Sequence, residues 1–120
     1  MTIWVGLIVA GSAGAACRLL LDNAVPHRVF PRGTLVINVV GSLALGLIIG
    51  AALYHAFPNT PKVVLGTGFC GAFTTFSTWT YETIQLLSDG HVREAALNAA
   101  GSVVACLAAA GLGLAVMAAI

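Results

Sequence analysis

The chain has 120 residues, of which 59% are hydrophobic and only 8% are charged. A water-soluble domain carries about 25% charged residues, because polar side chains must face water. The composition therefore excludes an ordinary soluble enzyme and a disordered tail, and a net charge of +1 provides no basic patch for nucleic acid. We expect an all-α integral membrane protein that binds no nucleic acid.

Four long apolar stretches follow one another along the chain. A membrane-spanning helix needs about 20 mostly apolar residues, and each stretch is long enough. Prolines, glycines and charged residues lie between the stretches and indicate loops. We predict one domain over residues 1–120, with four transmembrane helices at about residues 2–21, 33–54, 63–86 and 94–119.

So small a bundle has consequences for transport. Side chains fill the middle of four short helices and leave little room for a water-lined path, so a transport function would require an oligomer, and we expect a dimer. Small residues recur every fourth position at Ser42, Gly46 and Gly50. Such a face suits contact between subunits and helix packing within one subunit equally well.

Polar side chains form stripes on two of the apolar stretches. On the second, Thr34, Asn38 and Ser42 lie on one helix face, and on the fourth Asn98 and Ser102 form a matching stripe. Polar groups are costly in hydrocarbon, and they serve either as links between helices or as an ion path. We favour the ion path for Asn38.

The third stretch is the unusual one. Three glycines precede a run rich in hydroxyl side chains, and both features weaken a continuous helix. We predict a break near mid-membrane, where Gly71 is followed by Thr74 and Thr75. Free carbonyls at such a break can bind a cation, and free N–H groups can bind an anion. The break is the strongest indication of a site.

Aromatic side chains accompany this break at Phe69, Phe73, Phe76 and Trp79. Such a stripe normally packs in a core, but the positive edge of an aromatic ring also suits a small anion. No acidic residue lies in the body of any span, which argues against a cation pathway through the bundle. The cysteines and histidines lack metal-ligand spacing, and no nucleophile–base pair indicates an enzyme.

Three runs of sequence resemble the Fluc (CrcB) family of fluoride channels. They are GTLVINVVGS around Asn38, GFCGAFTTFST from Gly68 to Thr78, and GAACR ending at Arg18. The resemblance covers all four spans. It implies an antiparallel, dual-topology homodimer in the cell (inner) membrane, with two fluoride pores, a central structural sodium ion and no organic cofactor.

The resemblance also implies roles for residues at the break. Gly71 and Thr74 match the backbone carbonyls that hold sodium, and Asn38 matches the pore asparagine. Phe76 matches the first of two pore rings. Trp79 stands at the second ring position, where the family usually has phenylalanine, and its indole adds an N–H donor that can contact the anion.

Other matches extend the expected fluoride path along the polar stripes. Asn98 stands where many members carry tyrosine, and it still offers a donor. Arg18 and Glu82 match a vestibule arginine and a carboxylate of the third helix. The remaining matches to polar pore residues are Thr34, Ser77, Thr78 and Ser102.

Fluoride is held tightly by water, so a selective path must replace its hydration with close donors. We interpret the chain as a fluoride-selective channel for passive fluoride export, which reduces fluoride toxicity. One alternative is a small multidrug-type proton-coupled transporter, which needs a carboxylate in the first span, and residues 2–21 contain none. Another is a non-transporting membrane assembly protein, in which Asn38 and the threonines only lock helices together.

Overall fold

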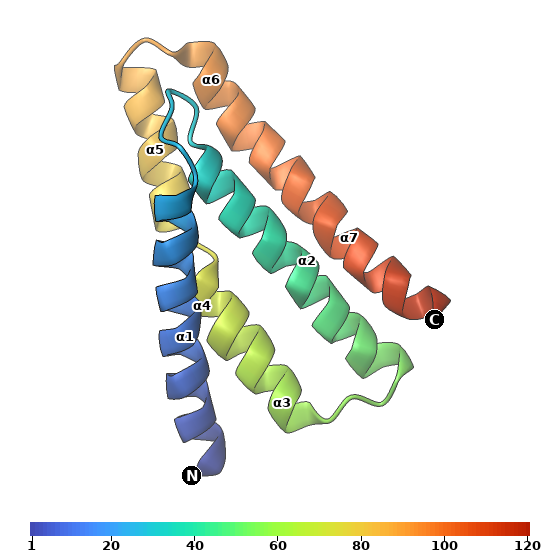
Figure 1. The fold of residues 1–120 in the computed structure, drawn as a ribbon. Helices are drawn as coiled ribbons and strands as arrows, with labels where there is room; N and C mark the ends of the chain where they lie inside the picture. The colour runs from blue at the N-terminus through green and yellow to red at the C-terminus, as the bar shows by residue number, and fades with distance from the viewer.

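The structure is a computed structural model that describes residues 1–120, and it is helical throughout, with no strand (Figure 1). Two segments, η1 and η2, are π-helical and continue directly into α4 and α7. The elements in chain order are α1 (Thr2–Ala24), α2 (Arg32–Tyr54), α3 (Asn59–Val63), η1 (Val64–Cys70), α4 (Gly71–Phe73), α5 (Ser77–Ser88), α6 (Val92–Ala96), η2 (Leu97–Gly101) and α7 (Ser102–Ala119).

Three helices are long and apolar enough to cross a membrane: Thr2–Ala24, Arg32–Tyr54 and Val92–Ala119. The first helix continues to Ala24, beyond its expected end at residue 21. It ends there because the backbone of the next residue, Val25, is extended. The expected third span divides into shorter helices, with Thr74–Phe76 between α4 and α5. The prediction of an all-helical, multi-pass membrane protein is confirmed, and a fourth crossing stays a prediction.

The outer surface of the molecule is apolar. Only 15 of the 120 residues are buried, and large side chains such as Trp4, Ile8 and Leu107 are mostly exposed. The molecule measures 48 × 32 × 20 Å, and its long dimension matches a bilayer of about 40–45 Å with its headgroups. Lipid, or a second copy of the chain, is therefore the surrounding that these side chains require.

Helices α2 and α7 run side by side along most of their length (Figure 1). Glycines make this approach possible: a Cβ atom on Gly113 would lie 2.7 Å from the Leu43 carbonyl oxygen, and one on Gly46 would meet the carbonyl of Ala110. A Cβ atom on Gly50 would lie 2.7 Å from the Cβ atom of Met117. Gly46 and Gly50 of the predicted small-residue face thus pack within one subunit.

A second close contact places α1 against the interrupted segment. A Cβ atom on Gly14, the one buried residue of α1, would meet the carbonyl of Phe69 in η1. Helix α1 also packs against α4. This contact brings Arg18, one turn further along α1, to the end of α4.

We predict that Gly113→Ala destabilises the protein by about 1–3 kcal/mol, the usual cost of overpacking, because its new methyl group would press on the α2 backbone. Gly111→Ala is the matched control on the same helix, since a Cβ atom there meets nothing within 4 Å. Thermal unfolding of both variants in detergent measures the difference. Equal unfolding temperatures would contradict the described α2–α7 contact.

Candidate functional site

The helix interruption at Thr74–Phe76 is the centre of the candidate site. Helix α4 ends at Phe73, and the backbone of Thr74 is extended, with φ −77° and ψ 160°. The Thr74 hydroxyl donates to the Cys70 carbonyl at 2.9 Å. Hydroxyl side chains offer the backbone such alternative partners, which explains why a run of them weakens the helix here.

Asn38 on α2 holds the interrupted backbone through two hydrogen bonds. Its Nδ2 donates to the Thr75 carbonyl at 2.9 Å, and the Thr75 N–H donates to its Oδ1 at 2.8 Å. The side-chain amide thus replaces the helical partners that the Thr75 backbone would otherwise have. Buried backbone polar groups need such partners, so Asn38 stabilises the open conformation.

The carbonyls of Gly71 and Thr74 are among those that lose their helical donors at this point. In a continuous helix the Gly71 carbonyl would accept from the Thr75 N–H, and the Thr74 carbonyl from the Thr78 N–H. Instead, the Thr75 N–H binds Asn38, and the Thr78 N–H donates to the Thr75 hydroxyl at 3.2 Å. Arg18 Nη1 approaches the Thr74 carbonyl at 3.4 Å. These oxygens are therefore placed to attract positive charge.

An open groove of about 420 Å³ lies beside the interruption. The rings of Phe76 and Trp79 stand next to each other there, with centroids 5.2 Å apart and a tilt of 49°. Phe76 is 76% exposed, so it projects from the subunit rather than into a core. The predicted site residues that line this groove are Asn38, Gly71, Thr74, Phe76, Trp79 and Ser102.

Ser77 and Thr78 lie in the first turn of α5, just outside the groove lining. The Thr75 hydroxyl contacts both side chains, at 3.4 Å from Ser77 Oγ and 3.0 Å from Thr78 Oγ1. Both residues are exposed. They therefore extend a cluster of hydroxyl groups outward from the interruption.

Asn98 lies behind the groove instead of lining it. It is fully buried; its Nδ2 donates to Thr83 Oγ1 at 2.9 Å, and its Oδ1 accepts from Ser102 Oγ at 3.3 Å. The Trp79 indole N–H donates to the Asn98 backbone carbonyl at 2.9 Å. The indole N–H of Trp79, which we expected to contact the anion, is therefore used in a hydrogen bond within the protein.

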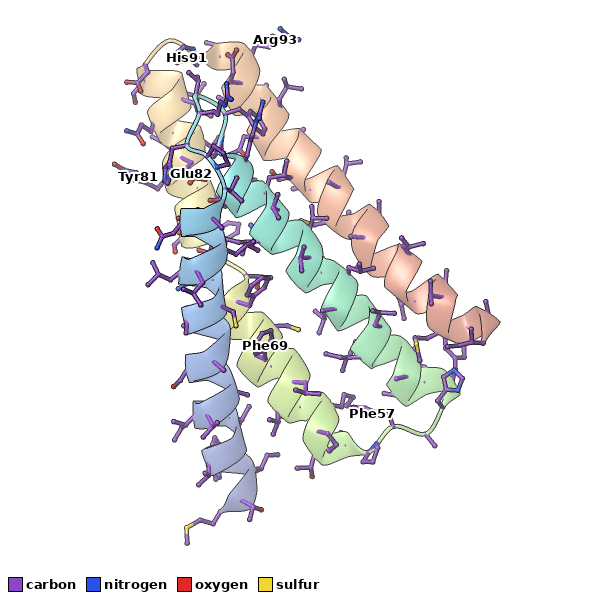
Figure 2. All side chains as sticks on the ribbon, viewed as in Figure 1. Phe57, Phe69, Tyr81, Glu82, His91 and Arg93 are labelled. Atoms are coloured by element: carbon purple, nitrogen blue, oxygen red, sulfur yellow. The ribbon has the colours of Figure 1, made fainter.

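Glu82 lines a separate cavity of about 360 Å³ under the connection from α1 to α2, and Thr34 binds Glu82 from α2. The Thr34 hydroxyl donates to Glu82 Oε1 at 2.8 Å, while Glu82 Oε2 is buried without a hydrogen-bond partner. Figure 2 shows Glu82 on α5, close to the C-terminal end of α1. Charged and titratable groups also line the cavity: Asp22, His27, Arg28, Arg32, Asp89 and His91.

Two threonines were missed as site residues by the sequence reasoning. Thr75 supplies the backbone that Asn38 holds. Thr83 links Asn98 to α5, because its hydroxyl accepts from Asn98 Nδ2 at 2.9 Å and donates to the Trp79 carbonyl at 2.8 Å. A usable signal existed for Thr75, because an unwound backbone requires a polar partner and Asn38 lies on a neighbouring span. The spacing of residues along α5 does not indicate that Thr83 meets Asn98, because that contact is made to another helix.

Comparison with known proteins agrees with these features. Residues 5–114 match the family model described as CrcB-like protein, Camphor Resistance (CrcB). The chain is 48% identical over 120 residues to the fluoride-specific ion channel FluC 1 of Frankia casuarinae, covering 93% of each chain. It is 50% identical over 117 residues to FluC 2 of Cutibacterium acnes, covering 94% of each. It is also 44% identical to FluC of Methanocaldococcus jannaschii, covering 82% of this chain and 81% of that protein. This chain therefore belongs to the CrcB family.

Proposed function

We propose that the chain is a fluoride-selective ion channel of the cell (inner) membrane, which exports fluoride passively and so reduces its toxicity. Its CrcB membership and relatives named as fluoride-specific ion channels support this function. The observation that carries the proposal is the groove at the helix interruption, where an asparagine amide lies beside two aromatic rings.

The chemistry of this groove suits a small anion. An asparagine amide has two N–H donors, and the hydrogen bond from Asn38 to the Thr75 carbonyl uses one of them. The edges of Phe76 and Trp79 add weak positive potential. No lysine or arginine lines the groove. Conduction requires binding that is strong enough for entry and weak enough for exit, which neutral donors provide better than a fixed charge.

We further propose that the channel is an antiparallel, dual-topology homodimer whose subunits each cross the membrane four times. The groove is open along one side of the subunit, and Phe76 is 76% exposed there. A second copy would close this side and shield both rings from lipid. Because two-fold symmetry repeats every feature, such a dimer would contain two equivalent fluoride pores.

A structural sodium ion at the dimer centre fits the residues present. The Gly71 and Thr74 carbonyls have lost their helical donors, and carbonyl oxygens are ligands that small hard cations prefer. Arg18 approaches the Thr74 carbonyl, which also indicates a negative local potential. When bound, sodium would supply positive charge between the interrupted helices, with the Gly71 and Thr74 carbonyls of both copies as its ligands.

Fluoride release from liposomes containing the purified protein tests this function. We expect rapid fluoride efflux at a fluoride electrode and retention of chloride at a chloride electrode, without a pH gradient. A proton-coupled transporter would require the gradient, and an assembly protein would release neither ion. Failure of a folded, dimeric protein to release fluoride would refute the channel.

Phe76→Ile is expected to abolish fluoride flux and leave the dimer intact, because it removes an aromatic edge from the groove, keeps an apolar side chain there, and disturbs no packing in the subunit core. Tyr81→Ile, on the adjoining helix α5, is the matched control. Tyr81 is 66% exposed and points outward from α5 (Figure 2), and it does not line the groove. Liposome efflux and gel filtration measure flux and assembly. Unchanged flux in Phe76→Ile would contradict the role of this ring.

Asn38→Asp is expected to reduce fluoride flux on the order of a thousandfold. Two negative charges about 4 Å apart repel by about 4 kcal/mol at an effective dielectric constant of 20, and each 1.36 kcal/mol changes a rate about tenfold. The carboxylate also loses the amide donor to the Thr75 carbonyl. Asn59→Asp, at the exposed start of α3, adds the same charge far from the groove. Equal efflux from the two variants would place the anion path elsewhere.

A further inference from the structure

Two hydrogen bonds join α5 to the first part of the last long helix, and two more support them, one within α5 and one within that last helix. We name the four residues that make them the α5–α7 clamp: Trp79, Thr83, Asn98 and Ser102. Thr83 Oγ1 donates to the Trp79 carbonyl at 2.8 Å and accepts from Asn98 Nδ2 at 2.9 Å. Ser102 Oγ donates to Asn98 Oδ1 at 3.3 Å. The fourth bond runs from the Trp79 indole N–H to the Asn98 carbonyl at 2.9 Å.

The acceptor of this fourth bond is part of the backbone. The Asn98 carbonyl lies in the π-helical segment η2, where it already accepts the backbone N–H of Ser102. A carbonyl oxygen has two lone pairs, so it can accept the indole as well. Asn98 is fully buried and Ser102 is 4% exposed. Hydrogen bonds in such surroundings are electrostatically stronger than in water, and the clamp fixes the ring that depends on it.

The clamp determines which edge of Trp79 meets the groove. Because Nε1 points into the contact with the buried Asn98, the ring carbons face the groove and Phe76. An N–H exposed there would add a second donor beside the Asn38 amide, and the two together would bind any halide more tightly than one. A ring edge attracts an anion only weakly, and its contribution depends on the angle at which it is held.

We propose that Trp79 is a specificity-determining ring whose indole N–H is withheld from the permeating anion by the α5–α7 clamp. Thr83 and Asn98 are positioning residues, which act on the anion only through Trp79. This assignment rests on the proposed function. It also changes the role of Asn98: its backbone carbonyl binds the ring, and its buried side-chain amide binds Thr83 and Ser102 instead of fluoride.

Replacing Trp79 with 3-benzothienylalanine tests the bond itself, because sulfur takes the place of the indole N–H and the ring keeps its shape. One net hydrogen bond is worth about three- to tenfold in an equilibrium, so we expect fluoride efflux relative to chloride to fall by that factor. The dimer should persist. Unchanged selectivity in this variant, beside a conducting wild-type protein, would overturn the proposal alone. A wild-type protein that releases no fluoride would overturn the proposed function, and this proposal with it.

A spectroscopic comparison separates ring positioning from general stability. In a Trp4→Phe background Trp79 is the remaining tryptophan, since the chain has two. Thr83→Val removes the clamp hydroxyl. The control Thr80→Val, also on α5, removes an exposed hydroxyl that donates to the Phe76 backbone carbonyl. We expect only Thr83→Val to weaken the indole N–H bond in ultraviolet resonance Raman spectra and to lower the fluorescence anisotropy of Trp79. Equal spectra for the two variants would overturn the role of Thr83.

Discussion

The paired hydrogen bonds between the Asn38 amide and the Thr75 backbone are the interaction on which the candidate site depends. Hydrocarbon offers no water to a broken helix, so each backbone group released at the break must find a partner in the protein. Asn38 satisfies both polar groups of one residue. The Gly71 carbonyl stays free of its helical donor as a result, and the Thr74 carbonyl does so because the Thr78 N–H binds the Thr75 hydroxyl. The rings of Phe76 and Trp79 lie beside an open groove.

A rigid frame holds this interruption in place. The close approach of α2 and α7 at Gly46 and Gly113 leaves no room for sliding, because any added carbon atom would meet the opposite backbone. Helix α2 carries Asn38, and the segment before α7 carries Asn98, so both asparagines sit on the same packed pair of helices. Sites built on packed helices hold their geometry more precisely than sites on loops.

The two asparagines also show how one residue type serves two purposes. Asn38 faces the groove and binds the backbone of the break, which leaves one N–H for a ligand. Asn98 is fully buried, and its amide is used in holding Thr83 and Ser102. Both π-helical segments contribute here, since η1 leads into the interruption and η2 presents the carbonyl that binds Trp79. Local widening of this kind is frequent at functional sites.

The sequence by itself determined the membrane class, the apolar spans and the CrcB family, because hydropathy and local motifs do not depend on which helices meet. It also singled out Asn38 and the weak helix after Gly71. An amide within an apolar span and a run of glycines and hydroxyl residues can both be recognised without knowing which helices meet. Only the tertiary structure decided that Thr75 is the partner of Asn38, that Thr34 binds Glu82 away from the groove, and that the Trp79 N–H binds Asn98. Each of these is a contact between helices distant in sequence, and its direction depends on helix rotation, which periodicity along one helix does not specify.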